Sequence, residues 1–404
     1  MIPLAMVRRA VERAIDSSQL PGDDDDLLDT AAVDSMGWVA ILSALEQQAG
    51  APHLGAQWPP GKPHSIRVLA ELLAENTAQP ERRVIERRES LRVGIRGWGT
   101  ALGSRTVSAC DLDVEYGLPA RTIGARTGLE SVARATESET ETTLARRACE
   151  EALCAARVEL DQIDLLVAAS ETFLGFPSLA AVLHSSLLLP EACWALDVGG
   201  GCLALLNALA TARAILAAGE ARLALVVAAD VHSRRLAGTS TPWQLAALFG
   251  DGAGAILLDG AAGVSSHRLG EFSFGCAGSF AGALRIAPGE AGDLSVEFRG
   301  HQLADAAISR LSGLIQELDG GEADAFAIHE PNPRALELVA KRTGIPLEKF
   351  VQLSRASGNL GSATCAVGIS RLLERRPPPR TIFLAALGPG LLWGAGHCVI
   401  EPQP

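Results

Sequence analysis

The chain has 404 residues, of which 48% are hydrophobic and 4% aromatic, and its formal net charge is −12. This length suffices for two or three domains, and such an acidic chain is a poor partner for nucleic acid. No uncharged apolar run reaches the roughly 18 residues of a membrane span, and no signal-peptide pattern opens the chain. The eight cysteines include no C-x-x-C pair. We therefore expect a cytoplasmic protein without a metal site.

Residues 1–76 differ in character from the rest of the chain, and their pattern predicts a small domain of four helices. Helical periodicity covers residues 3–16, and an acidic loop separates this segment from a second helix over 35–49. Three prolines then interrupt the chain before a last helix over 64–75. A unit of this size buries little surface and is only marginally stable.

The step Asp34-Ser35-Met36 opens the second of these helices. On its own, Asp or Ser before an apolar helix is commonly just an N-cap. With an acidic loop in front and an amphipathic helix behind, the segment resembles an acyl carrier protein over nearly all of residues 5–76. The resemblance implies that Ser35 carries 4′-phosphopantetheine, attached by a phosphopantetheinyl transferase. The phosphodiester would lie at the positive end of a helix, and the acidic surface would suit basic partner enzymes.

The remainder of the chain indicates α/β layers and an internal duplication. Residues 77–91 are charged and lack a sustained apolar face, so we interpret them as a linker. From residue 92 to 404, strands and helices alternate. The halves, about 92–260 and 261–404, repeat each other with an offset of 160 residues, which relates the buried strands after Asp164 and Asp324.

The same offset relates two glycine-rich turns. Three glycines precede Cys202, between a short apolar strand and a strongly helix-forming run, and the corresponding position in the second half is Ser362. At the start of a helix, unpaired N–H groups and the macrodipole favour the thiolate, so we expect Cys202 to be nucleophilic. The alternative for an arbitrary cysteine after a glycine turn is a small core residue.

A duplicated mixed α/β unit with a cysteine in its first half is similar to the thiolase architecture. Over most of residues 92–402 the chain resembles the type III ketosynthases, the ketoacyl-carrier-protein synthases that start fatty acid and polyketide chains. Seven motifs stand in the family's order: Arg126-Thr-Gly-Leu129, Phe176-Pro-Ser178, Asp197-Val-Gly-Gly-Gly-Cys202, Phe249-Gly-Asp-Gly-Ala-Gly254, Ile328-His-Glu-Pro-Asn332, Gly358-Asn359 and Gly388-Pro-Gly-Leu-Leu-Trp-Gly394. We therefore expect a thiolase-like duplicated mixed α/β layered fold, preceded by the helical carrier domain.

The resemblance implies roles for three catalytic residues. Cys202 would form a thioester with the acyl group. His329 and Asn359 would donate hydrogen bonds to the thioester oxygen of an incoming extender and stabilise the enolate that forms there. By residue type alone, His329 could be a core or surface histidine and Asn359 a turn residue. Relatives that transfer acyl groups to hydroxyls can carry Asp at the asparagine position, so Asn359 favours condensation.

Further site residues are implied by the same resemblance. The backbone N–H groups of Cys202 and Gly390 would form the oxyanion hole, although Pro389 replaces the middle glycine of that turn. Arg126 would attract a pantetheine phosphate, with a plain surface charge as the alternative. Relatives that load from coenzyme A often carry a tryptophan four residues before this arginine. Thr122 stands there instead, which implies a weaker coenzyme A site.

Glu330, next to His329, is unusual, and it could shift the pKa of that histidine or point to solvent. We predict a carrier-dependent ketosynthase that forms an acyl-cysteine thioester and catalyses decarboxylative Claisen condensation with a malonyl-type extender. The pathway would be fatty acid, polyketide or related secondary metabolism. One alternative is an acyltransferase acting from a carrier or coenzyme A onto a hydroxyl or amine, and another is a non-catalytic partner subunit. The resemblance also implies a homodimer.

Overall fold

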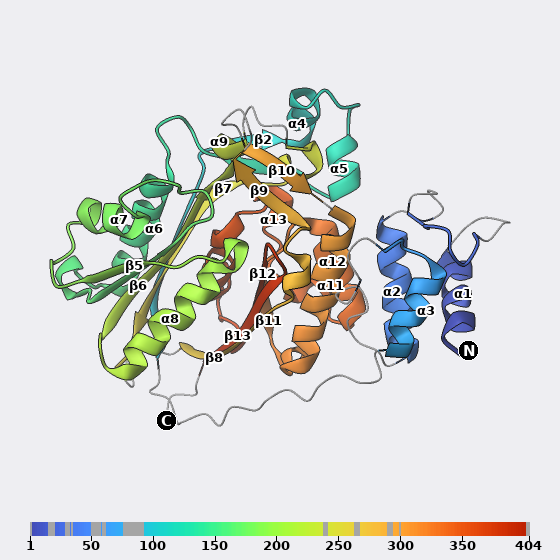
Figure 1. Ribbon diagram of the computed structural model, residues 1–404. Helices are drawn as coiled ribbons and strands as arrows, with labels where there is room; N and C mark the ends of the chain where they lie inside the picture. The colour runs from blue at the N-terminus through green and yellow to red at the C-terminus, as the bar shows by residue number, and fades with distance from the viewer. Residues whose placement is uncertain are drawn as a thin grey trace.

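The computed structural model describes residues 2–14, 21–28, 33, 35–49, 58, 62–75, 93–236, 241–261, 267–288, 294–298 and 300–400 (Figure 1). The predicted linker over 77–91 and Asp34 lie outside these residues. In the described N-terminal part the helices are α1 (Ile2–Ala14), α2 (Ser35–Ala49) and α3 (Ile66–Glu75). They share a hydrophobic cluster of their own, which is centred on buried side chains such as Trp38 and Leu69.

The large region has the predicted alternation of strands and helices. Its first half contains β1 (Gly94–Leu102), β2 (Arg105–Ser108), α4 (Ala109–Glu115), α5 (Thr122–Thr127), β3 (Ser131–Arg134), α6 (Glu141–Ala156), β4 (Leu165–Ala169), α7 (Leu179–Leu187), β5 (Trp194–Asp197), α8 (Ala204–Ala218), β6 (Leu223–Val231), α9 (His232–Leu236), α10 (Trp243–Ala246) and β7 (Asp251–Asp259). Its second half contains β8 (His267–Cys276), β9 (Leu284–Pro288), β10 (Leu294–Phe298), α11 (Gly300–Glu317), β11 (Ala325–Ile328), α12 (Pro333–Thr343), α13 (Ser354–Ser357), α14 (Thr364–Leu373), β12 (Thr381–Gly388) and β13 (Leu392–Ile400).

Strands of both halves form one mixed sheet. Within the described residues it has nine strands in the order β11-β12-β13-β8-β1-β7-β6-β4-β5. The strands β5, β4 and β6 are parallel, as are β11 and β12, whereas the strands between them pair antiparallel. The two half-sheets join where β1 pairs with β8 through Gly94–Arg268 and Ile95–His267.

Helices arrange these half-sheets into layers. The helices α8 and α14 lie between the half-sheets, because their buried residues form one cluster with strands of both halves. The helices α6 and α7 cover the outer face of the first half-sheet, and α11 and α12 cover that of the second (Figure 1). One stretch among the described residues, Gly201–Ala218, is long and apolar enough to cross a membrane. It contains α8 of the inner layer, and half of its residues are buried in the protein. The predicted thiolase-like layered fold is confirmed.

The predicted duplication is confirmed in atomic detail. The Oδ2 atom of Asp164 accepts the N–H groups of Arg222 and Leu223 at 2.9 and 3.0 Å. The Oδ2 atom of Asp324 likewise accepts the N–H groups at positions 380 and 381, both at 3.0 Å. A single 3-10 turn precedes the inner helix in both halves, at 201–203 and at 361–363. The sequence offset of 160 residues therefore corresponds to a repeated three-dimensional unit.

Candidate active site

Cys202 lies in the turn between β5 and α8, where the two halves touch. Gly200 and Gly201 have φ angles of 135° and 59°, a region in which side chains other than glycine's are strained. A Cβ atom on Gly201 would lie 2.5 Å from Cδ of Pro389, and one on Gly388 would lie 2.3 Å from the Gly200 oxygen. The glycines therefore allow the Cys202 turn to pack directly against the turn that comes after β12.

One cavity of about 160 Å³ brings the three predicted catalytic residues together. Cys202, His329 and Asn359 all line it. None of its lining residues is Asp, Glu, Lys or Arg, and the rest of the wall is mainly aliphatic: Leu245, Leu248, Phe249, Leu284, Ala304, Ala307, Ile308, Leu311, Pro331, Asn332, Ala335, Leu387, Gly388, Pro389 and Leu391. Such a wall suits an acyl chain, and the low polarity strengthens any hydrogen bond made inside.

His329 and Asn359 form a hydrogen-bonded pair. The Nε2 atom of His329 lies 3.1 Å from Oδ1 of Asn359, which also accepts the Gly361 N–H at 3.0 Å. Since Oδ1 accepts, His329 Nε2 carries the proton. Burial lowers the pKa of His329, so the ring is neutral. A neutral imidazole carries one N–H, so His329 donates to a substrate oxygen by sharing its Nε2 proton between that oxygen and Asn359 Oδ1, whereas the Asn359 carboxamide has N–H groups of its own.

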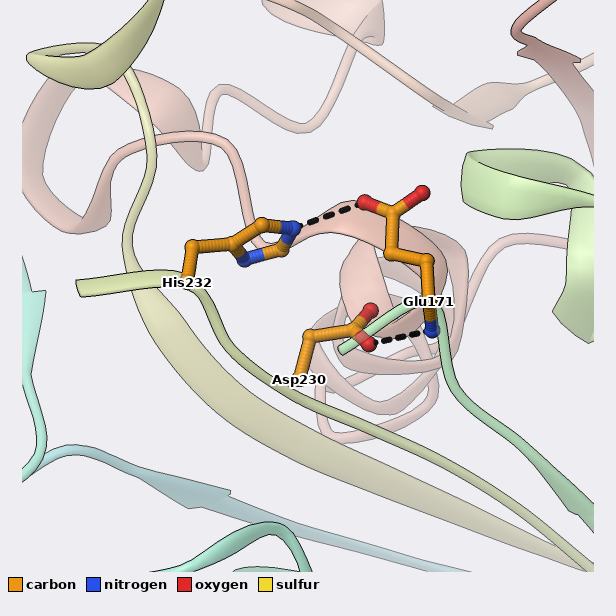
Figure 2. A group of neighbouring side chains, drawn as sticks. All are labelled: Glu171, Asp230 and His232. Carbon is orange, nitrogen blue, oxygen red and sulfur yellow. Dashed lines mark hydrogen bonds and ion pairs between the residues drawn. The ribbon is translucent and has the colours of Figure 1, made fainter. Parts of the chain in front are cut away.

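Cys202 also contacts an ionic cluster of Glu171, Asp230 and His232 that sequence reasoning missed. The Sγ atom lies 3.5 and 3.4 Å from the Oε1 and Oε2 atoms of Glu171. Figure 2 shows Glu171 accepting a hydrogen bond of 2.7 Å from His232 Nε2, and its backbone N–H donating to Asp230 Oδ1 at 2.7 Å. Glu171 lies just after β4 and His232 just after β6, and neighbouring parallel strands bring residues after their carboxyl ends together. This rule could have predicted from the sequence that Glu171 and His232 lie close together.

The charges in this cluster alter one expectation. Burial opposes the charged form of His232, but Glu171 and the nearby aspartates raise its pKa to about 9. Burial likewise disfavours ionised Glu171, but its hydrogen bond with His232 lowers its pKa. Burial, followed by Glu171 and Asp230, raises the pKa of Cys202 well above its ordinary value. The expectation that the helix start favours the thiolate of Cys202 is therefore not met, because burial and the two carboxylates raise the pKa of the thiol.

The cluster is a hydrogen-bond network rather than a vacant cation site. Ligand atoms of Glu171, Asp230 and His232 lie within 4.8 Å of one another. The Oδ2 atom of Asp230, however, already accepts the N–H and hydroxyl of Ser362 at 2.7 and 2.6 Å, and Oδ1 accepts the Ser170 hydroxyl at 3.0 Å. A protonated imidazole has no lone pair to give a metal.

The remaining site predictions fall in several places. Gly390 has a φ of 77°, and its neighbours Pro389 and Leu391 line the cavity. Arg126 is exposed at the end of α5, with its guanidinium 5.8 Å from the ring centre of Trp243. Trp243 begins α10, whose Leu245 lines the cavity. The sequence comparison at Thr122 therefore missed an aromatic side chain that a different element brings to Arg126.

Glu330 matches neither of the two alternatives raised for it. Its buried carboxylate accepts the N–H of Leu353, and the N–H and hydroxyl of Ser354 at 2.9 Å each. Burial raises the pKa of Glu330 to about 7. Glu330 therefore anchors the segment that leads through α13 to Asn359.

Ser35 is the first residue of α2, and its side chain lies outside the described residues. One turn later, Val39 is 2% exposed and belongs to the cluster of α11 and α12 rather than to that of the other N-terminal helices. The α2 helix therefore packs on α11, the helix that contributes Ala304, Ala307, Ile308 and Leu311 to the cavity wall.

A duplicated α/β fold with cysteine, histidine and asparagine around one cavity defines a thiolase-like enzyme. Two family models match the chain: 3-oxoacyl-[acyl-carrier-protein] synthase III over residues 196–278, and its C-terminal domain over 316–400. The beta-ketoacyl-[acyl-carrier-protein] synthase III of Ruegeria sp. (strain TM1040) is 30% identical over 318 residues, which cover 75% of this chain and 98% of the relative. The chain belongs to the ketoacyl-carrier-protein synthase III family.

Known structures agree with this assignment. The 3-oxoacyl-(acyl carrier protein) synthase III of Pseudomonas aeruginosa PAO1 superposes with a TM-score of 0.69 at 26% identity, covering 77% of this chain and 99% of that one. The priming beta-ketosynthase of the R1128 polyketide pathway shares the fold, with a TM-score of 0.70 at 24% identity, covering 80% and 100%. The relatives are thus matched almost completely, and about a quarter of this chain lies outside the matches.

Proposed function

We propose that this protein is a carrier-dependent ketosynthase that joins an acyl group on Cys202 to a malonyl-type extender with loss of carbon dioxide. The observation that carries the proposal is that Cys202, His329 and Asn359 line one cavity whose walls carry no charged side chain, in a chain of the ketoacyl-carrier-protein synthase III family. The cavity excludes fixed charge where an apolar chain would lie and retains neutral donors where charge would develop.

The residues have complementary roles in this reaction. Cys202 attacks the donor thioester and takes the acyl group, and the backbone N–H groups of Cys202 and Gly390 bind the oxyanion. The extender then loses carbon dioxide, and its electron pair becomes an enolate whose oxygen accepts hydrogen bonds from His329 and Asn359. The enolate carbon attacks the acyl-cysteine carbonyl, which forms the β-ketoacyl product and releases the Cys202 sulfur.

The N-terminal unit serves as the tethered carrier in this proposal. Ser35 carries 4′-phosphopantetheine, added by a phosphopantetheinyl transferase, and holds either the acyl donor or the extender. Two observations support this role: Ser35 begins α2, and Val39 on the same helix packs against the helix that walls the cavity. A short tether raises the effective concentration of the arm at its own active site.

Arg126 and Trp243 form the entrance for the pantetheine phosphate in this proposal. The exposed guanidinium supplies charge, and the nearby indole supplies a flat apolar surface. The same pair would accept a carrier-bound or coenzyme A-bound substrate, since both contain phosphopantetheine.

A homodimer also belongs to the proposal. Strand β5 lies at the edge of the sheet, and large hydrophobic side chains are exposed on and around it: Leu174, Phe176, Leu188 and Trp194. An open strand edge with exposed apolar residues is a surface that a second copy can cover. The Trp194→Glu variant would then elute as a monomer in size-exclusion chromatography with light scattering, whereas a monomeric wild-type protein would refute the dimer.

The decisive experiment for the reaction combines mass spectrometry and carbon dioxide release. The full chain is first treated with a phosphopantetheinyl transferase, which should add one arm at Ser35 and none in Ser35→Ala. Acyl loading should then modify Cys202, and a malonyl-carrier should release carbon dioxide and yield a β-ketoacyl product. Transfer to an alcohol or amine without carbon dioxide release would instead establish an acyltransferase.

A further inference from the structure

The contact between Glu171 and Cys202 raises a question that the proposed function leaves open, namely where the thiol proton goes. Burial and neighbouring carboxylates hold Cys202 in its thiol form, and a thiol is a weak nucleophile. His329 hydrogen-bonds Asn359. The two carboxylate oxygens of Glu171, by contrast, lie 3.5 and 3.4 Å from Sγ.

We propose that Glu171 is a further catalytic residue, which accepts the Cys202 thiol proton as the sulfur attacks the acyl thioester and then returns it to the departing pantetheine sulfur. This inference rests on the proposed function, because it concerns the acylation step of that reaction. It gives Glu171 a role in the first half-reaction, whereas His329 and Asn359 serve the second.

The step balances without a further reactant. The S–H bond of Cys202 breaks, its proton moves to a Glu171 oxygen, and a bond forms between Sγ and the thioester carbon. As the tetrahedral intermediate collapses, the carbon–sulfur bond to pantetheine breaks. The departing sulfur takes the proton from Glu171 and leaves as a thiol, and Glu171 is again a carboxylate.

The network around Glu171 keeps it ionised and aimed at the sulfur. The Nδ1 atom of His232 faces the Gly250 carbonyl at 3.2 Å, and its Nε2 atom faces Glu171 at 2.7 Å. Both partners accept, so both ring nitrogens carry protons and the ring is a cation. Asp230 holds the Glu171 backbone N–H. His232 and Asp230 are therefore positioning residues.

Glycines from both halves confine the same carboxylate. A Cβ atom on Gly201 would lie 3.2 Å from Glu171 Oε2, and one on Gly361 would lie 2.5 Å from Oε1. The carboxyl group thus lies between the turn that carries the nucleophile and the turn that comes after Asn359. A side chain that merely stabilised the fold would not need both oxygens within reach of the sulfur.

The test compares two reactions of Cys202 in the full chain. Acylation by acetyl- and hexanoyl-pantetheine is monitored by intact-protein mass spectrometry, and alkylation by iodoacetamide is monitored from pH 6 to pH 10. The proteins are wild type, Glu171→Gln, Glu171→Asp, and Glu191→Gln as a control at an exposed carboxylate of the same half.

Opposite changes are expected in Glu171→Gln. Alkylation at pH 7.5 should become at least about tenfold faster, because loss of the negative charge lowers the thiol pKa. Acylation should become about 10²-fold slower or more, because the base is gone. Glu171→Asp, which keeps a carboxylate, should recover part of the acylation rate, and Glu191→Gln should match wild type in both reactions.

Acylation of Glu171→Gln at the wild-type rate would overturn the proposal. If this variant does not fold, the wild-type alkylation profile decides, since a midpoint above pH 9 is expected and a midpoint near pH 7 would show a preformed thiolate and no need for a base. Absence of any acyl adduct on wild-type Cys202 would instead refute the proposed function. These failures are therefore distinguishable.

Discussion

His329 and Asn359 share a hydrogen bond of 3.1 Å between Nε2 and Oδ1, although one lies just after β11 and the other just after α13. The amide oxygen holds the imidazole proton, and burial keeps the ring neutral. The pair is therefore neutral: Asn359 offers its amide N–H groups, and His329 stabilises an enolate oxygen by sharing its one N–H between that oxygen and Asn359 Oδ1.

The first prediction separates the two half-reactions. Asn359→Asp places a carboxylate against His329, which favours the imidazolium and removes an amide donor. Carbon dioxide release from a malonyl-carrier should fall about 10²- to 10³-fold, whereas acyl loading of Cys202 should remain near the wild-type rate. Both are measured on the same protein, and equal loss of both activities would contradict the assignment.

The second prediction concerns the close packing at Gly361. This residue has a φ of 57°, and a Cβ atom there would lie 2.5 Å from Glu171 Oε1 and 2.7 Å from Asp230 Oδ2. Gly219 has a φ of 80° with open space around it, so Gly219→Ala is a matched control for backbone strain alone. Gly361→Ala should lower the free energy of unfolding, measured in urea, by about 1–3 kcal/mol more than Gly219→Ala does. If the two variants lose equal stability, the ionic cluster can accommodate the added methyl group without a clash, and this prediction is wrong.

The third prediction concerns pH and Glu330. The pKa of Glu330 is raised from an ordinary value of 4.5 to about 7, so the folded protein binds this proton more tightly than the unfolded chain. The contribution of this tighter proton binding to the free energy of unfolding is fully present below pH 4.5 and is lost as the pH rises through 7. Glu330→Gln should therefore remove a decline of at most about 3 kcal/mol in the free energy of unfolding between pH 5 and pH 8. Urea unfolding at both pH values measures it, with the exposed Glu348→Gln as a control that should keep the wild-type slope.

The fourth prediction tests the contact between α2 and α11. Val39 is buried on the α11–α12 cluster, whereas Ala40 on the same helix is exposed. For the arm proposed on Ser35, Val39→Asp should slow acyl transfer to Cys202 by about tenfold or more, because burying a charge at this contact is unfavourable. Transfer from free acyl-pantetheine should be unchanged. Ala40→Asp should behave as wild type, and an equal effect of the two variants would argue against docking through Val39.

Much of this architecture could be predicted from the sequence because it repeats. The glycine turn before Cys202 and the segment around Ser362 lie 160 residues apart, and the fold places them in equivalent turns before α8 and α14. His329 and Asn359 could be predicted because short, distinctive motifs surround them.

The ionic cluster could not be predicted in the same way. Glu171 is 31 residues from Cys202 and 61 from His232 along the chain, and no local pattern links the three. Only the adjacency of β5, β4 and β6 brings them together. The contact of Val39 with α11 could not be predicted either. An apolar residue on a small amphipathic helix predicts a position in the core of its own domain, not a contact with another domain.

The pairing of Cys202 with Ser362 shows a division of labour between the repeats. The first copy of the turn carries the reactive sulfur of Cys202. In the second copy, Ser362 donates both its N–H and its hydroxyl to Asp230, a carboxylate of the ionic cluster. Two identical copies of the first repeat would contain two thiols and would lack the serine hydroxyl that donates a hydrogen bond to this aspartate. The repeats have thus diverged into parts that are no longer interchangeable, and each now depends on the other for a working centre.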